Sequence, residues 1–167
     1  MNINDRIENY LLKRKEAHLF RQLSINQKLI DFSSNDYLGL SKSAYIKQQV
    51  DIEYNILKTT KTGATGSRLL NGNSSLFEDL EQLLADTHHA EAALLFNSGF
   101  DANVGLISTV ARPNDVIFYD ELVHASIHQG MQLSGAKLVA FAHNDMIDLE
   151  EKLKLKAVGQ IGFIITE

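Results

Sequence analysis

The sequence has no cysteine and no tryptophan, and it has a single proline in 167 residues. Without cysteine the chain can form no disulfide, no zinc–thiolate site and no cysteine nucleophile. This absence fits a reducing compartment, and we expect a cytoplasmic protein. One proline and ten glycines also exclude the collagen-like and low-complexity classes.

Long apolar runs and an excess of positive charge are also missing. The longest apolar runs, such as AALLF and GFIIT, are far shorter than a membrane span. The N-terminal segment MNINDRIENYLLKRK has no apolar core followed by a cleavage site. The net charge is −5 and no basic patch stands out. We therefore expect neither a membrane nor a nucleic acid as a partner.

The composition that remains is that of a globular protein, with 44% hydrophobic and 22% charged residues. The length suggests one domain or a part of one. Helical spacing of apolar residues predicts helices over residues 4–24, 44–57 and 125–133. Continuous apolar runs predict strands at 29–32, 92–96, 116–119, 137–142 and 161–166.

Capping signals mark where further helices begin. Ser75 with Glu78, and Ser98 with Asp101, have the spacing of capping boxes, and Asp145 is a third predicted N-cap. Strands and helices therefore alternate from about residue 75 onward. This order predicts an α/β fold with a mostly parallel sheet.

Three segments carry candidate chemistry, and each has a structural alternative. Gly99, in FNSGFDAN, lies between a strand and a helix, where it could admit a phosphate or simply form a tight turn. His124, in DELVHAS, could stack on a planar cofactor or transfer a proton, or it could only begin a helix. Arg68, in the glycine-rich TGATGSRLLNGN, could bind an anion or belong to a connecting loop. No spacing of histidine and acidic residues indicates a metal site.

The order of these segments resembles the N-terminal part of the α-oxoamine synthases, which are fold-type-I enzymes dependent on pyridoxal phosphate (PLP). The segments are SSNDYLGLS, TGATGSRLLNGN, LLFNSGFDAN, DELVHAS, FAHND and IITE. The resemblance implies an incomplete three-layer α/β/α transferase fold with a mostly parallel sheet. It also implies an N-terminal helix and extended segment at residues 1–45, with the first part of the PLP-binding large domain at 46–167.

The resemblance implies a homodimeric C-acyltransferase that condenses an amino acid with an acyl thioester and releases carbon dioxide. SSNDYLGL and FAHND favour the members that join L-alanine to pimeloyl-CoA, or to the acyl-carrier-protein thioester, in biotin biosynthesis. The alternatives are a glycine C-acetyltransferase or 5-aminolevulinate synthase type of enzyme, an aminotransferase, or a non-catalytic truncated remnant.

The resemblance also implies roles for individual residues. The cofactor contacts would come from Gly99 and Phe100 beside the phosphate and from His124, which would stack on the pyridine ring and face the substrate. The residues implied in substrate binding are Arg21, Asn35, His124 and Glu167.

One departure from the family pattern concerns the Schiff-base lysine. No lysine of this sequence lies in a segment like the family's lysine motif, and the aspartate that pairs with the pyridine nitrogen has no counterpart. We therefore assign no catalytic residue to this chain and expect it to be inactive alone. We also expect the strand at 92–96 to lack neighbours.

Overall fold

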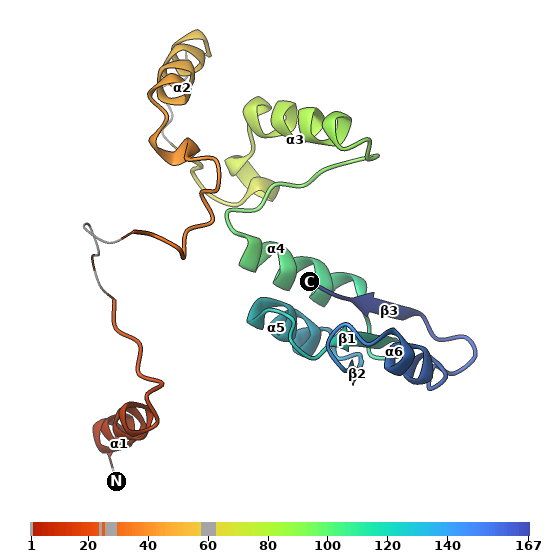
Figure 1. Ribbon diagram of the computed structural model, residues 1–167. Helices are drawn as coiled ribbons and strands as arrows, with labels where there is room; N and C mark the ends of the chain where they lie inside the picture. The colour runs from red at the N-terminus through yellow and green to blue at the C-terminus, as the bar shows by residue number, and fades with distance from the viewer. Residues whose placement is uncertain (1, 24, 26–29, 58–62) are drawn as a thin grey trace. The chain divides into compact units, whose positions relative to one another are not determined.

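The computed structural model describes residues 2–23, 25, 30–57 and 63–167 (Figure 1). The chain divides into two compact units, Met1–Thr62 and Gly63–Glu167. The boundary predicted after residue 45 falls inside the first unit and stays a prediction about the domains.

The first unit begins with α1, Ile3–Glu16, whose N-terminus is a capping box. The Asn2 side chain accepts from the Asp5 amide at 2.9 Å, and the Asp5 carboxylate accepts from the Asn2 amide at 3.1 Å. His18 has a positive φ of 55°, and the Leu19 amide donates to the Arg14 carbonyl at 2.8 Å. This left-handed turn ends the helix. The predicted helix is therefore wrong over residues 17–23, and residue 24 lies outside the described residues.

The segment SSNDYLGLS forms turns that lead to α2, Ala44–Ile56, the second predicted helix, which is confirmed. The Asp31 carboxylate accepts from the amides of Ser33 and Ser34, which closes a local turn. The strand predicted at 29–32 is accordingly wrong over residues 30–32, and residue 29 lies outside the described residues. A short 3₁₀ helix, Leu40–Lys42, follows before α2.

The second unit begins with a turn of π-helix, Arg68–Gly72, and with α3, Ser75–Thr87. The N-cap of α3 is Ser74, and its side chain makes no capping hydrogen bond. The predicted box of Ser75 and Glu78 is therefore wrong. The Glu78 carboxylate instead accepts a hydrogen bond from the side-chain amide of Asn73 at 2.8 Å. Asn73 precedes the helix, so this bond replaces the one that a capping box would form with the N-cap amide.

The predicted strand at 92–96 is extended but belongs to no sheet. Leu94 is 66% exposed, and Phe96 lies against Gly105 of α4, Gly99–Val110. A strand requires a hydrogen-bonded neighbour, and the described part of the chain supplies none for this segment. Residues 92–96 therefore have the apolar character of a strand but no hydrogen-bonded partner strand among the described residues.

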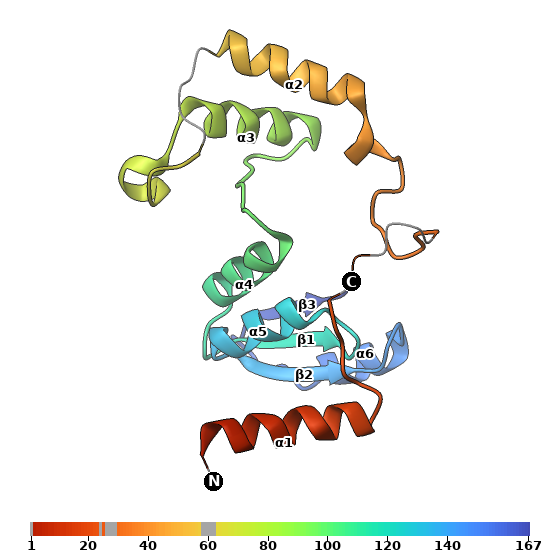
Figure 2. The same ribbon diagram turned by 90° about the vertical axis from the view of Figure 1, so that its left-hand side faces the viewer.

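The remaining elements form a three-layer α/β/α arrangement, as predicted (Figure 2). Parallel strands lie in the order β2–β1–β3, and the two cores place α4 and α5 on one face of the sheet and α6 on the other. The new bounds are β1 Val116–Asp120, α5 Ala125–Ser134, β2 Lys137–Phe141, α6 Met146–Leu153 and β3 Gly162–Ile165. The caps predicted at Ser98 and Asp145 are confirmed, since each side chain accepts from an amide of the first turn.

The central strand β1 supplies side chains to two separate cores. Ile117 packs with residues of α4 and α5, and the flanking Val116 and Phe118 pack with Phe141 and residues of α6. All four of these side chains are almost completely buried. The alternation follows from the period of two residues in a strand, and it fixes which helices cover which face.

Helices α4 and α5 approach most closely at Gly130 of α5. A Cβ atom there would lie 2.9 Å from the Asn103 carbonyl oxygen, 3.0 Å from the Ile107 Cβ and 3.3 Å from the Val104 Cα. Two of these neighbours are backbone atoms, which cannot move aside without shifting the helix. The contact therefore requires glycine.

We predict that Gly130→Ala forces α4 and α5 apart and lowers the free energy of unfolding by about 1–3 kcal/mol. Urea denaturation measures this change. The matched control is Gly63→Ala, because a Cβ at Gly63 would meet no atom within 4 Å. Equal urea midpoints for Gly130→Ala and Gly63→Ala would show that the close contact between α4 and α5 does not limit the stability of the fold.

Candidate functional site

The candidate site lies where the three parallel strands end. Asp120, Phe141 and Ile165 are the last residues of β1, β2 and β3. Because α4 precedes β1 and α5 follows it, both helices run antiparallel to the strand and begin at this same edge. Ligands of open α/β sheets bind at the carboxyl ends of the strands.

His124 is the N-cap of α5, and its imidazole takes the role that serine or aspartate usually has. The Ser126 amide donates to His124 Nδ1 at 3.1 Å, and the Ser126 hydroxyl lies 2.8 Å from the same nitrogen. Asn103 of α4 donates through Nδ2 to the Ser126 hydroxyl at 3.0 Å. The side chains therefore link the beginnings of the two helices.

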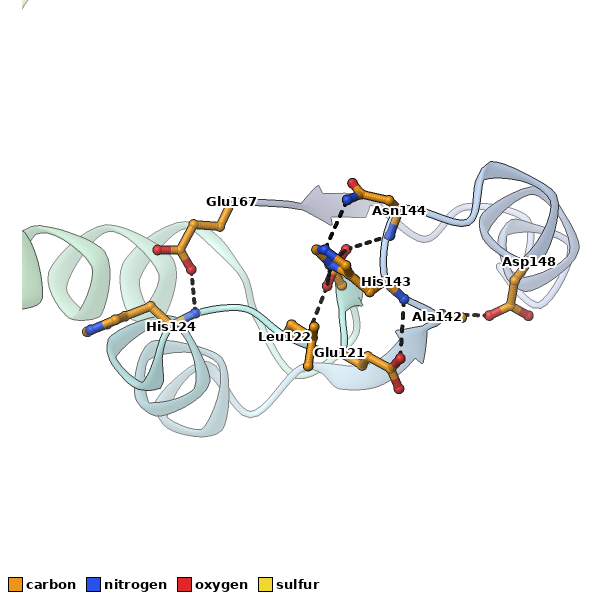
Figure 3. Close-up of polar contacts among 9 residues, drawn as sticks. Glu121, Leu122, His124, Ala142, His143, Asn144, Asp148 and Glu167 are labelled. Atoms are coloured by element: carbon orange, nitrogen blue, oxygen red, sulfur yellow. Dashed lines mark hydrogen bonds and ion pairs between the residues drawn. The ribbon is translucent and has the colours of Figure 1, made fainter. Parts of the chain in front are cut away.

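Glu167 joins this group from the end of β3. Its carboxylate accepts from the His124 backbone amide at 2.6 Å, and Figure 3 shows the imidazole extending on the side away from Glu121 and His143. We call Asn103, His124, Ser126 and Glu167 the helix-end cluster. The structure thus brings together two predicted site residues, His124 and Glu167. Their roles toward cofactor and substrate stay predictions.

Asn103 and Ser126 were not predicted from the sequence. The spacing of Ser126 two residues after His124 is an N-cap signal, since an N-cap side chain accepts from the second or third helical amide. Asn103 had no such signal, because it lies 23 residues from its partner in the chain.

Gly99 and Phe100 form the first turn of α4, whose early amides have no partner within the helix. A Cβ at Gly99 would meet no atom within 4 Å, so the space beside this turn is open. Gly99 lies four residues, or about 6 Å along the helix axis, from Asn103. An anion at this helix end would therefore lie close to the helix-end cluster.

The other two predicted site residues, Arg21 and Asn35, belong to the first unit. Both are exposed there, Arg21 after α1 and Asn35 in the turns before α2. Their contacts with substrate stay predictions.

A second network at the same edge is centred on the buried carboxylate of Asp120. It accepts from the amides of Leu122 at 2.9 Å and Asn144 at 3.0 Å and contacts His143 Nδ1 at 2.9 Å (Figure 3). The Leu122 amide is the main cause that lowers the Asp120 pKa; burial opposes it, and Asn144 and His143 contribute. The Glu121 carboxylate accepts from the His143 amide at 3.3 Å. Through these contacts, the FAHND segment, residues 141–145, links the end of β2 to the end of β1. We call these contacts the Asp120 network.

Arg68, a candidate anion-binding residue, is held by partners within the chain. Its guanidinium forms a two-pronged ion pair with Glu81 at 2.6 and 2.9 Å, and its Nε donates to Asn73 at 2.9 Å. The guanidinium also lies over the Phe77 ring, 4.6 Å from the centroid. The Leu95 amide donates to Glu81 at 2.8 Å. Arg68 could bind an anion or belong to a connecting loop, and these contacts within the chain favour the second alternative.

This pairing lowers the pKa of Glu81 to about 2, chiefly through the Arg68 hydrogen bond and then the Leu95 amide. A carboxyl whose pKa is lowered stabilises the folded state above its unfolded pKa, here 4.5, and this stabilisation is lost as the pH falls through about 2. We predict that Arg68→Gln raises the Glu81 pKa toward 4.5, as measured by NMR titration of the carboxyl group.

The effect on unfolding should follow the same pH window. The difference in urea midpoint between the native protein and Arg68→Gln should be greatest above pH 4.5 and should disappear toward pH 2. Arg112→Gln is the control, because it removes the same charge outside the Glu81 network. A Glu81 pKa that is equal in both variants would contradict the assignment.

Among residues 2–23, 25, 30–57 and 63–167, no group of three or more histidine and acidic side chains could hold a metal ion. In the same residues, no helix is long and apolar enough to cross a membrane.

Comparison with protein families and curated proteins gives consistent matches. The model described as aminotransferase class I and II matches residues 27–167. The putative 8-amino-7-oxononanoate synthase of Bacillus licheniformis is 42% identical over the whole chain, which spans 44% of that protein. The 8-amino-7-oxononanoate synthase of Emericella nidulans is 45% identical over 85% of the chain and 35% of its own length. The chain therefore spans less than half of these relatives.

Solved structures share the fold. The serine palmitoyltransferase of Sphingomonas wittichii matches 98% of this chain and 45% of its own, with a TM-score of 0.81 and 25% identity. The 8-amino-7-oxononanoate synthase of Francisella tularensis matches 83% of this chain and 37% of its own, with a TM-score of 0.64 and 29% identity.

Proposed function

Because the chain belongs to the aminotransferase class I and II family, we propose that it forms part of a PLP-dependent α-oxoamine synthase. The relatives named 8-amino-7-oxononanoate synthase confirm the resemblance to the α-oxoamine synthases that the sequence motifs indicated. The proposed reaction joins an amino acid to an acyl thioester with loss of carbon dioxide.

The observation that carries the proposal is the convergence of two helix N-termini and His124 at one edge of the sheet. Helices α4 and α5 both begin there, and the helix dipole makes such ends suitable for a phosphate. Gly99 leaves the α4 end open, and the His124 side chain is exposed beside it. A phosphorylated, planar, aromatic cofactor fits this combination of groups.

In this arrangement, the residues of the chain would bind the cofactor and orient it toward the substrate. The amides of Gly99 and Phe100 would hold the phosphate, and the His124 ring would lie against the cofactor ring. PLP, when bound, supplies the electron sink for the negative charge that forms when carbon dioxide leaves. Arg21, Asn35 and Glu167 are the proposed substrate contacts, since a cationic fork such as that of Arg21 suits a carboxylate.

For the substrates, we propose L-alanine and a pimeloyl thioester, of CoA or acyl carrier protein, which places the enzyme in biotin biosynthesis. The names of the curated relatives support this choice. A homodimer and a cytoplasmic location belong to the same proposal. An enzyme with a different amino acid and thioester is the second candidate, favoured by the match to a serine palmitoyltransferase.

The reaction is tested by measuring CoA release from the PLP-loaded protein isolated from its source, with four substrate pairs. These are L-alanine with pimeloyl-CoA, glycine with acetyl-CoA, glycine with succinyl-CoA and L-serine with palmitoyl-CoA. We expect the first pair to give the highest kcat/KM. A higher value with another pair would transfer the assignment to that member of the family.

The cofactor attachment is tested by borohydride reduction and peptide mass spectrometry of the protein isolated from its source. We expect a pyridoxyl-modified lysine outside residues 1–167, and no stoichiometric adduct on the 167-residue chain alone. A stoichiometric adduct within these residues would contradict the expected inactivity of the chain.

The role of His124 is tested by His124→Ala. We predict a changed absorbance spectrum of bound PLP and turnover reduced by roughly tenfold or more, since a group that positions reactants contributes at least this much. Gln129→Ala, on the exposed side of the same helix, is the control. An unchanged spectrum and turnover in His124→Ala would remove this residue from the site.

A further inference from the structure

We propose that Ser126 and Asn103 are positioning residues that hold His124 in the neutral tautomer with its proton on Nε2. The ring then presents an N–H donor to an anionic oxygen bound at the ends of α4 and α5. The tautomer follows from contacts within this chain, whereas the use of the donor rests on the proposed function.

The first contact that fixes the tautomer comes from the backbone. The Ser126 amide donates to His124 Nδ1 at 3.1 Å. A backbone amide can only donate, so Nδ1 must accept through its lone pair. In a neutral imidazole with an accepting Nδ1, the proton is on Nε2.

The second contact comes from the Ser126 hydroxyl, which is completely buried. Asn103 donates through Nδ2 to this oxygen at 3.0 Å and so occupies one of its lone pairs. The hydroxyl hydrogen is then free to point to His124 Nδ1, 2.8 Å away. Asn103 thus sets the direction of the Ser126 hydroxyl, and the hydroxyl supports the same tautomer as the amide.

The opposite nitrogen of the ring faces away from these contacts. Within the described part of the chain, His124 Nε2 forms no hydrogen bond, and Figure 3 shows the ring extending away from the Asp120 network. The donor belongs to the N-cap residue of α5, and the Ser126 hydroxyl that supports the ring contacts Asn103, one turn from the start of α4. An anion is favoured at such helix N-termini. A carboxylate or phosphate oxygen is the acceptor that this position suits.

The sharpest test is Asn103→Asp, which preserves shape and replaces a donor by an acceptor. The new carboxylate should take the Ser126 hydroxyl hydrogen, so that the serine oxygen turns its lone pairs toward Nδ1. The measurement is two-bond ¹H–¹⁵N correlation NMR of the imidazole in the purified protein without cofactor, with the His124 signals assigned by their loss in His124→Gln. We expect the Nε2–H tautomer to dominate in the native protein.

In Asn103→Asp, the fraction with a proton on Nδ1 should rise roughly two- to tenfold, the effect of one neutral hydrogen bond. Ser126→Ala provides a second variant should the first not fold. Because it removes the hydroxyl but keeps the amide donor, it should produce a smaller shift in the same direction. The control is Ser134→Ala, which removes a buried hydroxyl that bonds to the Met131 carbonyl at the other end of α5.

A native protein with the proton on Nδ1 would overturn the proposal. So would an Asn103→Asp variant whose tautomer ratio equals that of Ser134→Ala, because the contact would then be structural only. These results are obtained without PLP, so they stand even if the proposed reaction fails. In the loaded enzyme, Asn103→Asp should raise the KM for L-alanine more than the KM for the thioester.

Discussion

The burial of β1 on both faces is the constraint on which the second unit depends. Its side chains alternate between a core shared with α4 and α5 and a core shared with α6, and Val116, Ile117 and Phe118 are all at most 1% exposed. A strand in this position must be covered on both sides, so the helices that precede and follow it run antiparallel to it. Their N-termini then meet at its carboxyl end. The geometry of the candidate site is thus a consequence of packing the most buried strand.

The two hydrogen-bond networks at this edge have different chemical characters. In the Asp120 network, a buried carboxylate faces the amides of Leu122 and Asn144 and the His143 ring, so its capacity to accept is used within the chain. Such a network holds loops in place. The helix-end cluster fixes only one nitrogen of His124 and leaves the other directed outward. The first network therefore joins the strand ends, and the second leaves one imidazole nitrogen of His124 without a partner among the described residues.

Sequence patterns predicted most of the second unit because its signals are local. The apolar runs of β1, β2 and β3 and the caps at Ser98 and Asp145 each involve residues close together in the chain. The failures occur where a distant or competing partner decides. Helix α1 ends at the left-handed His18, and the Glu78 carboxylate bonds to Asn73 before the helix. Residues 92–96 have strand character but no neighbouring strand among the described residues, which is what the family resemblance led us to expect. In the candidate site, the places of Gly99 and His124 at the starts of helices could be predicted from the sequence, and their roles stay predictions. Asn103 could not, because its contact with Ser126 spans 23 residues.

A fixed neutral imidazole is well matched to a site formed by helix ends. The amides of the first turns of α4 and α5 already provide a positive potential for an anion, so a charged ring is not required to attract it. What the amides cannot provide is a donor directed at one particular oxygen. A proton on Nδ1 would face the Ser126 amide, whereas a proton on Nε2 is on the side of the ring away from this contact. The capping contact that begins α5 therefore also sets the direction in which His124 can donate, and the stability of the helix and the chemistry of the site depend on the same hydrogen bond.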